Sequence, residues 1–508
     1  MKKCILLFMT LLTISSVSAQ TFDLYDAGMY IPYKVGDLYY TLDTVNNTAT
    51  VTYEYLRSSE NYSGLTSVTI PDFVTIYGRR FNVVAIGECA FAHCADLKVV
   101  IMSDKLRSIG NSAFFECSNL VSVTIPNNVT MVGNSAFTGC SCLRMPLYNQ
   151  HVFAYMPESY SGAYVIPDGV KVIAGAAFLR CSKLTSVVIP NTTTEIKYAA
   201  FNGCSALEKI QIPNSITHIE ELCFAGCNSL NSPVYNENIF FYMPRSYSGA
   251  YSIPEGIKEI AGAAFLQCDK LTYIILPNSI KILGKQAFEG CGSLKHIKIP
   301  SSVTNIGDYA FKDCIALKMV KVPEGIATIE YATFSGCNNL ISVEIPNSVT
   351  SIKMSAFQGC TNIITPVYNS QIFAYMPKSY SGSYVIPDGI RVIAANAFED
   401  CDNLTSVTIP NSVTTVGVSA FAGCTKIVKP VHNSYIFAYM PKSYSGSYVI
   451  PNGIQVIAAG AFMGCNNLTS VTIPNSVTTI GDFAFYDCKN LQPITLPSSV
   501  TNVGMFAF

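Results

Sequence analysis

The chain has 508 residues and a formal net charge of −1, from 32 Lys and Arg against 33 Asp and Glu. Such a near-neutral balance lacks the positive field that nucleic-acid binding usually needs, so a general DNA or RNA binder is not expected. With 49% hydrophobic and 13% charged residues, the chain has material for a large folded core and little for a charged disordered tail.

Residues 1–19 have the pattern of a secretory signal peptide. Lys2 and Lys3 precede an apolar run, which is followed by a small-residue segment ending at Ala19. The apolar run is too short to span a bilayer, and no later stretch approaches about 20 continuous apolar residues. We therefore expect a secreted or extracellular cell-surface protein with no transmembrane segment. Cys4 precedes the apolar run and does not stand at the cleavage point, so a lipoprotein is not indicated.

Residues 20–80 are predicted to form an N-terminal β cap. Residues 38–42 and 49–55 alternate between apolar and polar side chains on either side of Asn46 and Asn47, as expected of two strands joined by a turn. A cap of this kind closes the open end of a repeat array.

A single unit repeats throughout residues 81–508. Its landmark is an Ala-Phe dipeptide or a close variant, which recurs in steps of 23 or 41 residues. The sixteen phenylalanines are Phe91, Phe114, Phe137, Phe178, Phe201, Phe224, Phe265, Phe288, Phe311, Phe334, Phe357, Phe398, Phe421, Phe462, Phe485 and Phe508. A period in this range, with apolar residues spaced L-x-x-V-x-I, is typical of a solenoid of about sixteen coils.

The local pattern predicts a structure for each part of a coil. Val407 and Ile409 alternate with polar residues and predict a half-buried strand, which Pro410 ends. Val413 and Val416 then return the chain to the next turn. Four apolar residues spaced 0, 1, 4 and 7 predict a short helical turn. They are Ala397, Phe398, Cys401 and Leu404. The expected fold is mainly β with short helical turns.

The steps of 41 residues carry 18-residue insertions of one type, near residues 144–163, 231–250, 364–383 and 428–447. Two aromatic, β-prone runs flank P-x-S-Y-S-G, which predicts a hairpin or an additional coil strand. The inserted tyrosines are secondary binding candidates, which either pack against neighbouring coils or form an adhesive aromatic rim for protein or glycan. They are Tyr155, Tyr160, Tyr242, Tyr247, Tyr375, Tyr380, Tyr439 and Tyr444.

The unit C-x-x-L-x-x-V-x-I-P-x-x-V-x-x-I-x-x-x-A-F-x-x-C resembles the Treponema pallidum-type leucine-rich repeat of the BspA-like surface antigens, over about residues 65–508. The resemblance implies a leucine-rich repeat solenoid that adheres to a host matrix or cell-surface protein, or to another cell's surface. It implies no enzyme activity and no fixed binding residues. The usual leucine-rich repeat has an Asn after each strand, and these residues form a buried ladder. That position varies here, with Ser412 in one unit and Asn128 in another, so the ladder is not expected.

Fifteen of the 19 cysteines share one repeat position. Export favours disulfides, but a position on the apolar side of every coil is better explained as a small buried hydrophobe. Cys140 and Cys142 form a lone C-x-C without a second pair, so no metal is expected. The five His form no H-E-x-x-H, and neither a nucleophile elbow nor a P-loop occurs, so we expect neither a cofactor nor catalysis.

Strand positions two and four after the Leu are predicted to point outward. Coils near both ends of the array carry Ser and Thr there, such as Ser406 and Thr408, whereas the middle coils carry basic, aromatic and apolar residues. The binding candidates are Lys209, Tyr273, His296, Lys298, Met319 and Lys321. They form either a drifting solvated surface or a partner-binding patch. The leading hypothesis is a protein-binding adhesion module, and the alternative is a structural surface-layer or stalk protein that self-associates.

Overall fold

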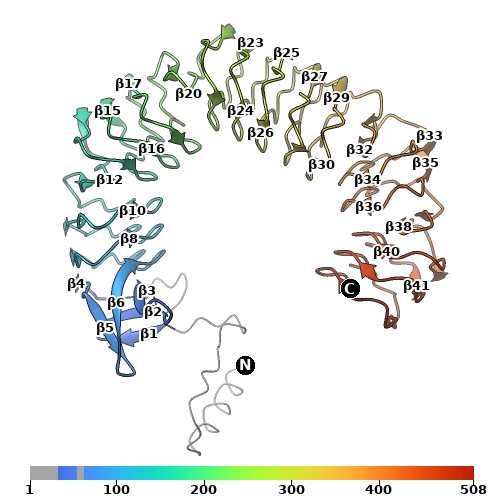
Figure 1. The fold of residues 1–508 in the computed structure, drawn as a ribbon, viewed down its shortest axis with the longest axis horizontal. Helices are drawn as coiled ribbons and strands as arrows, with labels where there is room; N and C mark the ends of the chain where they lie inside the picture. Colours follow the sequence, from blue (N-terminus) through green and yellow to red (C-terminus); the bar gives the residue numbers. More distant parts are fainter. Residues whose placement is uncertain (1–31, 54–61) are drawn as a thin grey trace, which may run out of the picture.

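The structure is a computed structural model that describes residues 32–53 and 62–508. These residues form an arc of stacked coils with two rows of strands, one along the outside and one along the inside of the arc (Figure 1). The described part of the chain contains no helix. The predicted solenoid with an N-terminal β cap is confirmed, while the predicted signal peptide and residues 20–31 and 54–61 of the predicted cap region lie outside the described residues.

The cap is a small sheet that leads directly into the inner row. It consists of β1 (Tyr33–Val35), β2 (Leu38–Asp43), β3 (Thr48–Thr52), β5 (Phe73–Ile76) and β6 (Arg79–Ile86). Strands β2 and β3 pair antiparallel, while β3 and β6 pair parallel, which changes a hairpin into the parallel pattern of the coils. The Tyr62 ring stacks on Phe91 at 4.9 Å between centroids and so covers the first ring of the core.

The outer strands pair parallel within their sheets and carry the L-x-x-V-x-I segment or a close variant, except for the four insertion strands β13, β21, β33 and β39, which have Gly at the Leu position. Val407 and Ile409 are buried and Thr408 is exposed, as the alternation predicts. The outer strands are β4 (Ser67–Thr69), β7 (Val99–Ile101), β9 (Ser122–Val123), β13 (Ser161–Val165), β15 (Lys183–Val188), β17 (Lys209–Gln211), β21 (Gly249–Ser252), β23 (Leu271–Ile275), β25 (His296–Ile297), β27 (Met319–Lys321), β29 (Ser342–Glu344), β33 (Gly382–Val385), β35 (Leu404–Thr408), β39 (Gly446–Val449) and β41 (Leu468–Thr472).

The inner strands are two residues long and lie on the concave side of the arc (Figure 1). At their ends the coils approach closely: a Cβ on Gly417 would lie 2.3 Å from the backbone nitrogen of Ala395. The inner strands are β8 (Ser108–Ile109), β10 (Met131–Val132), β14 (Val172–Ile173), β16 (Glu195–Ile196), β18 (His218–Ile219), β22 (Glu259–Ile260), β24 (Ile282–Leu283), β26 (Asn305–Ile306), β28 (Thr328–Ile329), β30 (Ser351–Ile352), β34 (Val392–Ile393), β36 (Thr415–Val416), β40 (Val456–Ile457), β42 (Thr479–Ile480) and β43 (Asn502–Val503).

The A-F-x-x-C segment is a pair of tight turns and not the predicted helical turn. In one coil, the Ala422 amide donates to the carbonyl of Ser419, and left-handed φ values of 56° at Ser419 and 77° at Gly423 interrupt any helix. Other backbone groups bond between coils, since the Phe398 amide donates to the carbonyl of Ala420 at 2.7 Å. A helix would use these groups internally. The four apolar residues of the predicted spacing are nevertheless all buried.

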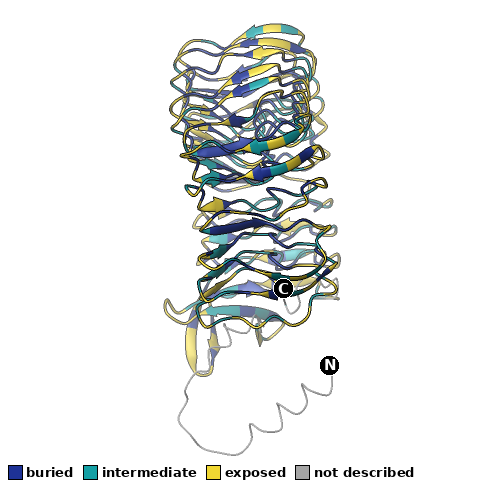
Figure 2. Cartoon of the chain, turned by 90° about the vertical axis from the view of Figure 1, so that its right-hand side faces the viewer, coloured by how far each residue is buried: buried dark blue, intermediate teal, exposed yellow. Residues whose placement is uncertain are grey.

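The core is a column of stacked rings between the two rows. Phe311 and Phe334 are fully buried, and their centroids lie 5.6 Å apart with planes 4° from parallel. Phe398 and Phe421 stack at 4.9 Å. Figure 2 shows the coils as layers in which buried and exposed residues alternate along the strands. Each coil therefore buries its apolar side chains against its neighbours.

The cysteines of the repeat position lie beside this column, and from Cys117 to Cys488 they are free thiols. The Cys314 Sγ donates to the carbonyl oxygen of Phe288 at 3.1 Å, and Cys424 does the same to Phe398 at 3.0 Å. Burial raises the pKa of the Cys360 thiol to about 12. The cysteine is thus a small core residue that also satisfies a carbonyl of the preceding coil.

Each insertion combines the two predicted forms, a hairpin and an additional outer strand. The hairpins are β11 (Leu147–Tyr148) with β12 (Val152–Tyr155), β19 (Val234–Tyr235) with β20 (Ile239–Tyr242), β31 (Val367–Tyr368) with β32 (Ile372–Tyr375), and β37 (Val431–His432) with β38 (Ile436–Tyr439). In the first insertion, β12 pairs with inner strand β14 and β13 pairs with outer strand β15. Each insertion therefore adds a layer of strands to the stack beyond the sixteen units. A new sheet begins at each insertion in both the inner and the outer row.

A buried asparagine fastens each hairpin to the coil before it. The Asn369 side-chain nitrogen donates to the carbonyls of Pro346 and Val349, both at 2.8 Å. Its oxygen accepts from the backbone amides of Gln371 and Ile372 at 2.8 and 2.9 Å. The equivalent residues are Asn149, Asn236 and Asn433. The role of this asparagine was not predicted from the sequence. Its only signal there is that Asn recurs three positions before the inward Val or Ile of each hairpin.

Candidate functional site

Five of the six predicted binding residues lie together at three neighbouring outer strands: four lie on β23, β25 and β27, and Lys298 directly follows β25. Tyr273 is the parallel-register neighbour of His296, and Met319 occupies the same position one coil later. Lys298 and Lys321 occupy the outward position two residues further along each coil. These five residues, together with Lys295 and Lys318, are called the central patch.

The central patch faces solvent on the convex side of the arc, where Figure 1 shows β23, β25 and β27 at the outer edge. Tyr273 is 40% exposed and Met319 is 57% exposed, while Ile274 and Val320 between the outward residues are buried. The alternation of the strand thus separates core residues from surface residues. A partner has access to an aromatic ring, an imidazole and a thioether in one row.

Lysine amines dominate the charge of the central patch. Lys295 and Lys318 are exposed at the position directly after the Leu and lie on adjacent coils, since the Lys318 amide donates to the carbonyl of Lys295 at 3.2 Å. Neither lysine was predicted as a binding residue, because only the positions two and four after the Leu were expected to point outward. The Lys321 amine pairs with Glu344 on the next coil at 3.1 Å, and both side chains are well exposed.

Lys209 is not part of the central patch. It is exposed on β17, whereas Tyr273 and His296 lie on β23 and β25, beyond the additional insertion strand β21. The second insertion lies between them. The sequence places Lys209 two coils before the patch, but the insertion separates the sheets.

Of the two tyrosines predicted as candidates in each insertion, the one that ends the inner hairpin strand is a core residue, in keeping with the alternative of packing against neighbouring coils. Tyr155, Tyr242, Tyr375 and Tyr439 are 4–8% exposed. The hydroxyl of Tyr375 donates to the carbonyl of Cys360 at 3.0 Å, and burial raises the pKa of Tyr242 to about 12. The run Val-Phe-Ala-Tyr is buried along its whole length because β12 and its equivalents lie between two coils.

The other predicted tyrosine of each insertion, in the P-x-S-Y-S-G segment, is half-buried and remains at the surface. These residues are Tyr160, Tyr247, Tyr380 and Tyr444. The Tyr380 hydroxyl donates to the carbonyl of Ser383 at 3.1 Å, and its ring meets Tyr384 edge to face at 5.4 Å. Packing against the coil therefore holds the ring in place while leaving part of it accessible.

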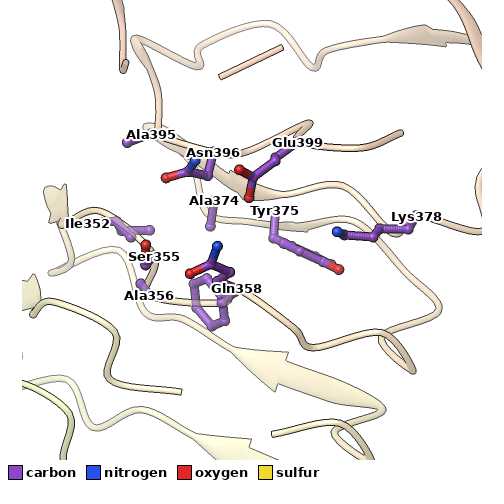
Figure 3. Close-up of a pocket in the computed structure, with 11 residues that line it drawn as sticks. Ile352, Ser355, Ala356, Gln358, Ala374, Tyr375, Lys378, Ala395, Asn396 and Glu399 are labelled. Atoms are coloured by element: carbon purple, nitrogen blue, oxygen red, sulfur yellow. The ribbon is translucent and has the colours of Figure 1, made fainter. Parts of the chain in front are cut away.

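A small recess lies beside the third insertion (Figure 3). Ser355, Gln358, Tyr375, Asn396 and Glu399 line it, and burial raises the pKa of Glu399. Its free volume of about 10 Å³ admits one water molecule. The recess is therefore too small for an organic ligand.

Residues 32–53 and 62–508 contain no group of three or more His, Cys, Asp and Glu side chains arranged to hold a metal ion. The same ranges hold no helix with the length and apolarity needed to cross a bilayer.

The sequence pattern of one family, BspA type Leucine rich repeat region (6 copies), matches residues 60–161, 151–249, 240–364, 369–446 and 432–508. No curated protein matches the chain. Among solved structures, the chain is similar to a leucine-rich repeat protein from Bacteroides ovatus, with 24% identity over 78% of this chain and 94% of that chain and a TM-score of 0.31.

Two further solved structures are similar to the chain. One is a leucine rich cell surface protein from Faecalibacterium prausnitzii, at 24% identity over 94% of this chain and 96% of that chain, with a TM-score of 0.27. The other is a leucine-rich repeat protein from Eubacterium ventriosum, at 21% identity over 77% of this chain and 94% of that chain, with a TM-score of 0.41.

Proposed function

We propose that this chain, which belongs to the BspA-type leucine-rich repeat family, is a non-catalytic adhesion module that binds a protein partner through the central patch. The observation that carries the proposal is the alignment of Tyr273, His296 and Met319 on three neighbouring coils, flanked by lysines. Binding surfaces rely on a few aromatic and basic anchors within a neutral surround, and the Ser and Thr coils supply that surround.

The proposed location is the outside of the cell. The signal-peptide pattern of residues 1–19 supports export. The similar protein from Faecalibacterium prausnitzii is called a cell surface protein, which agrees with this location. The proposed partner is a host matrix protein or a protein on another cell.

The charge of the central patch specifies the partner further. Lys295, Lys298, Lys318 and Lys321 concentrate positive charge on a chain whose net charge is −1, and only Lys321 pairs with a carboxylate, at 3.1 Å. An acidic surface on the partner complements these amines. Because the amines are solvent-exposed, added salt screens the attraction, and binding is expected to weaken between low and high ionic strength.

The test is surface-plasmon resonance of the exported chain on immobilised extracellular-matrix proteins. The variant Tyr273→Ala/Lys298→Ala/Lys321→Ala is expected to lose at least about tenfold in affinity. The matched control Ser406→Ala/Thr408→Ala/Thr472→Ala alters the equivalent outward positions of β35 and β41, whose coils carry Ser and Thr there, and is expected to bind normally. Equal affinity of both variants at low and high salt would reject the central patch.

A second experiment distinguishes adhesion to a partner from the alternative, a structural surface-layer or stalk protein that self-associates. Sedimentation velocity of the chain alone, over a range of concentrations, is expected to show monomer. If the chain assembles with itself and binds none of the matrix proteins, the surface-layer or stalk function replaces adhesion.

A further inference from the structure

Each insertion builds an aromatic cluster that belongs to neither the core nor the central patch. In the third insertion, Tyr368 is 45% exposed and its ring lies parallel to Phe373, at 6.1 Å and 7°. Phe373 in turn stacks on Phe398 at 4.8 Å. The exposed tyrosine is thus the surface member of a ring column that continues into the core, which fixes its orientation.

Two further tyrosines complete the cluster. Tyr384 meets Phe373 at 5.7 Å and 58°, and Tyr380 meets Tyr384 edge to face at 86°. The hydroxyl bond of Tyr380 to Ser383 holds that ring from the other side. A ligand that binds here finds rings already ordered, so it incurs little loss of side-chain entropy.

The same arrangement recurs with nearly identical geometry. The exposed ring stacks at 6.0 Å and 4° in the first insertion and at 5.8 Å and 9° in the second. The three tyrosine clusters are Tyr148 with Tyr160 and Tyr164, Tyr235 with Tyr247 and Tyr251, and Tyr368 with Tyr380 and Tyr384. In the fourth insertion, His432 replaces the exposed tyrosine and stacks on Phe437 at 6.0 Å.

The three clusters share polar surroundings but no common charge, because the residue two positions before Tyr160, Tyr247 and Tyr380 changes sign: it is Glu158, Arg245 and Lys378 respectively. Burial raises the pKa of Tyr384 to about 12, and the further causes are the phenols of Tyr368 and Tyr380 rather than a carboxylate. Tyr164 and Tyr251 have the same pattern of causes. Exposed serines flank each cluster, as Ser379 and Ser381 do in the third. Three phenols therefore lie near one another beside hydroxyl groups.

We infer that the three tyrosine clusters are binding subsites for a neutral saccharide chain. A sugar ring has an apolar face of C–H groups that packs on an exposed phenol ring, and hydroxyls around its edge that bond to phenol and serine oxygens. Because the flanking charge is negative at Glu158 and positive at Arg245 and Lys378, a ligand common to all three clusters is not selected by charge, which distinguishes it from the acidic partner of the central patch. Hence the inference stands apart from the proposed function.

Repetition of the clusters favours a polymer over a free sugar. Exposed Tyr148, Tyr235 and Tyr368 recur along one chain, so a polysaccharide engages several subsites at once. Weak single contacts then add as avidity. The His432 cluster is expected to contribute less, since an imidazole offers a smaller face than a phenol.

The test uses affinity electrophoresis of the full exported chain in gels that contain starch, mannan, galactan or xylan, with heparin as the charged comparison. The variant Tyr148→Ser/Tyr235→Ser/Tyr368→Ser is expected to lose at least tenfold in apparent affinity for a retained neutral polymer. The control Tyr198→Ser/Tyr331→Ser/Tyr486→Ser removes tyrosines of similar exposure, 40–47%, from outside the insertions, and is expected to bind like the unaltered chain.

Single substitutions guard against a folding defect in the triple variant. Each of the three single Tyr→Ser changes is expected to give a partial loss of retention with an unchanged melting temperature. The central-patch variant is expected to keep polysaccharide binding, and binding to persist in 1 M salt. Retention by no neutral polymer, equal loss in the control, or retention on heparin alone would overturn the inference. Retention on matrix protein that depends on these tyrosines would replace the saccharide with a protein ligand.

Discussion

The thiol of Cys360 lies 3.1 Å from the carbonyl oxygen of Phe334, one coil earlier in the stack. The same bond recurs in most coils of the array, for example from Cys337 to Phe311 and from Cys204 to Phe178. The cysteine thus links two neighbouring coils through a donor that a purely hydrophobic residue lacks.

Replacement of Cys360 by Ala is expected to destabilise the chain by about 1–3 kcal/mol, because it leaves a small cavity and a buried carbonyl without its donor. Cys360→Ser keeps a donor at the same place and is expected to lose less. Thermal unfolding of the two variants checks this. If the Ala variant proves as stable as the Ser variant or more so, the thiol acts only as a small hydrophobe.

The cysteines of the repeat position are expected to be inert in the native chain. Burial raises the pKa of Cys140 and of Cys401 to about 12, so the reactive thiolate is scarce at neutral pH. Thiol counting with and without denaturant is expected to find at least about ten groups that react only after unfolding. Recovery of these cysteines mainly as disulfides from native protein would contradict the buried-thiol account.

The raised thiol pKa values predict a loss of stability at alkaline pH. Below the ordinary thiol value of 9.0 both states keep their protons, and the stabilisation is fully present. Between pH 9.0 and about 12 the unfolded chain loses thiol protons while the native chain retains them, so the free energy of unfolding falls. The decrease is about 1.4 kcal/mol per pH unit for each thiol. Denaturant titrations from pH 8 to 11 are expected to show it, with a shallower slope in Cys360→Ala/Cys401→Ala/Cys424→Ala.

Truncation of the ring column is expected to damage several coils. Phe357 is 4% exposed and stacks on Phe334 at 5.6 Å. Phe357→Ala is expected to cost about 3–5 kcal/mol, and hydrogen exchange is expected to accelerate in the coils on both sides. The control is Met354→Ala in the same turn, where the side chain is exposed. Unchanged melting of the Phe357 variant would disprove the account of the core.

Replacement of the asparagine that holds each hairpin to the preceding coil is expected to lower stability strongly, although the residue is polar. Asn369→Ala leaves the carbonyls of Pro346 and Val349 and two backbone amides without partners, so a cost of at least about 3 kcal/mol is expected. Asn369→Asp keeps the acceptor but places an oxygen against both carbonyls, and is expected to be no better. Asn305→Ala, at an exposed position, is the control for melting experiments. Equal melting of Asn369→Ala and the control would show that the hairpin is held by other contacts.

The sequence by itself determined the periodic part of the protein. Val407 and Ile409 are two residues apart, which indicates that one face of the strand is buried. The recurrence of the unit in fixed steps indicates that every coil buries the same positions. The alternation within a strand and the repeat of the unit can both be recognised in the order of residues along the chain. The solenoid, the inward phenylalanines and cysteines, and the outward Tyr273 and Lys298 followed from them.

Only the tertiary structure decided features that depend on contacts between coils. The A-F-x-x-C turn is not helical because its backbone groups bond to the next coil, about 22 residues away, as in the bond from Phe398 to Ala420. Asn369 is structural because its partners Pro346 and Val349 lie one coil earlier. Tyr375 is buried because a neighbouring coil covers it, and Lys209 is apart from the central patch because an insertion restarts the sheet. Local spacing carries no information about such partners, since the coil stacking that brings them together is set by the whole array.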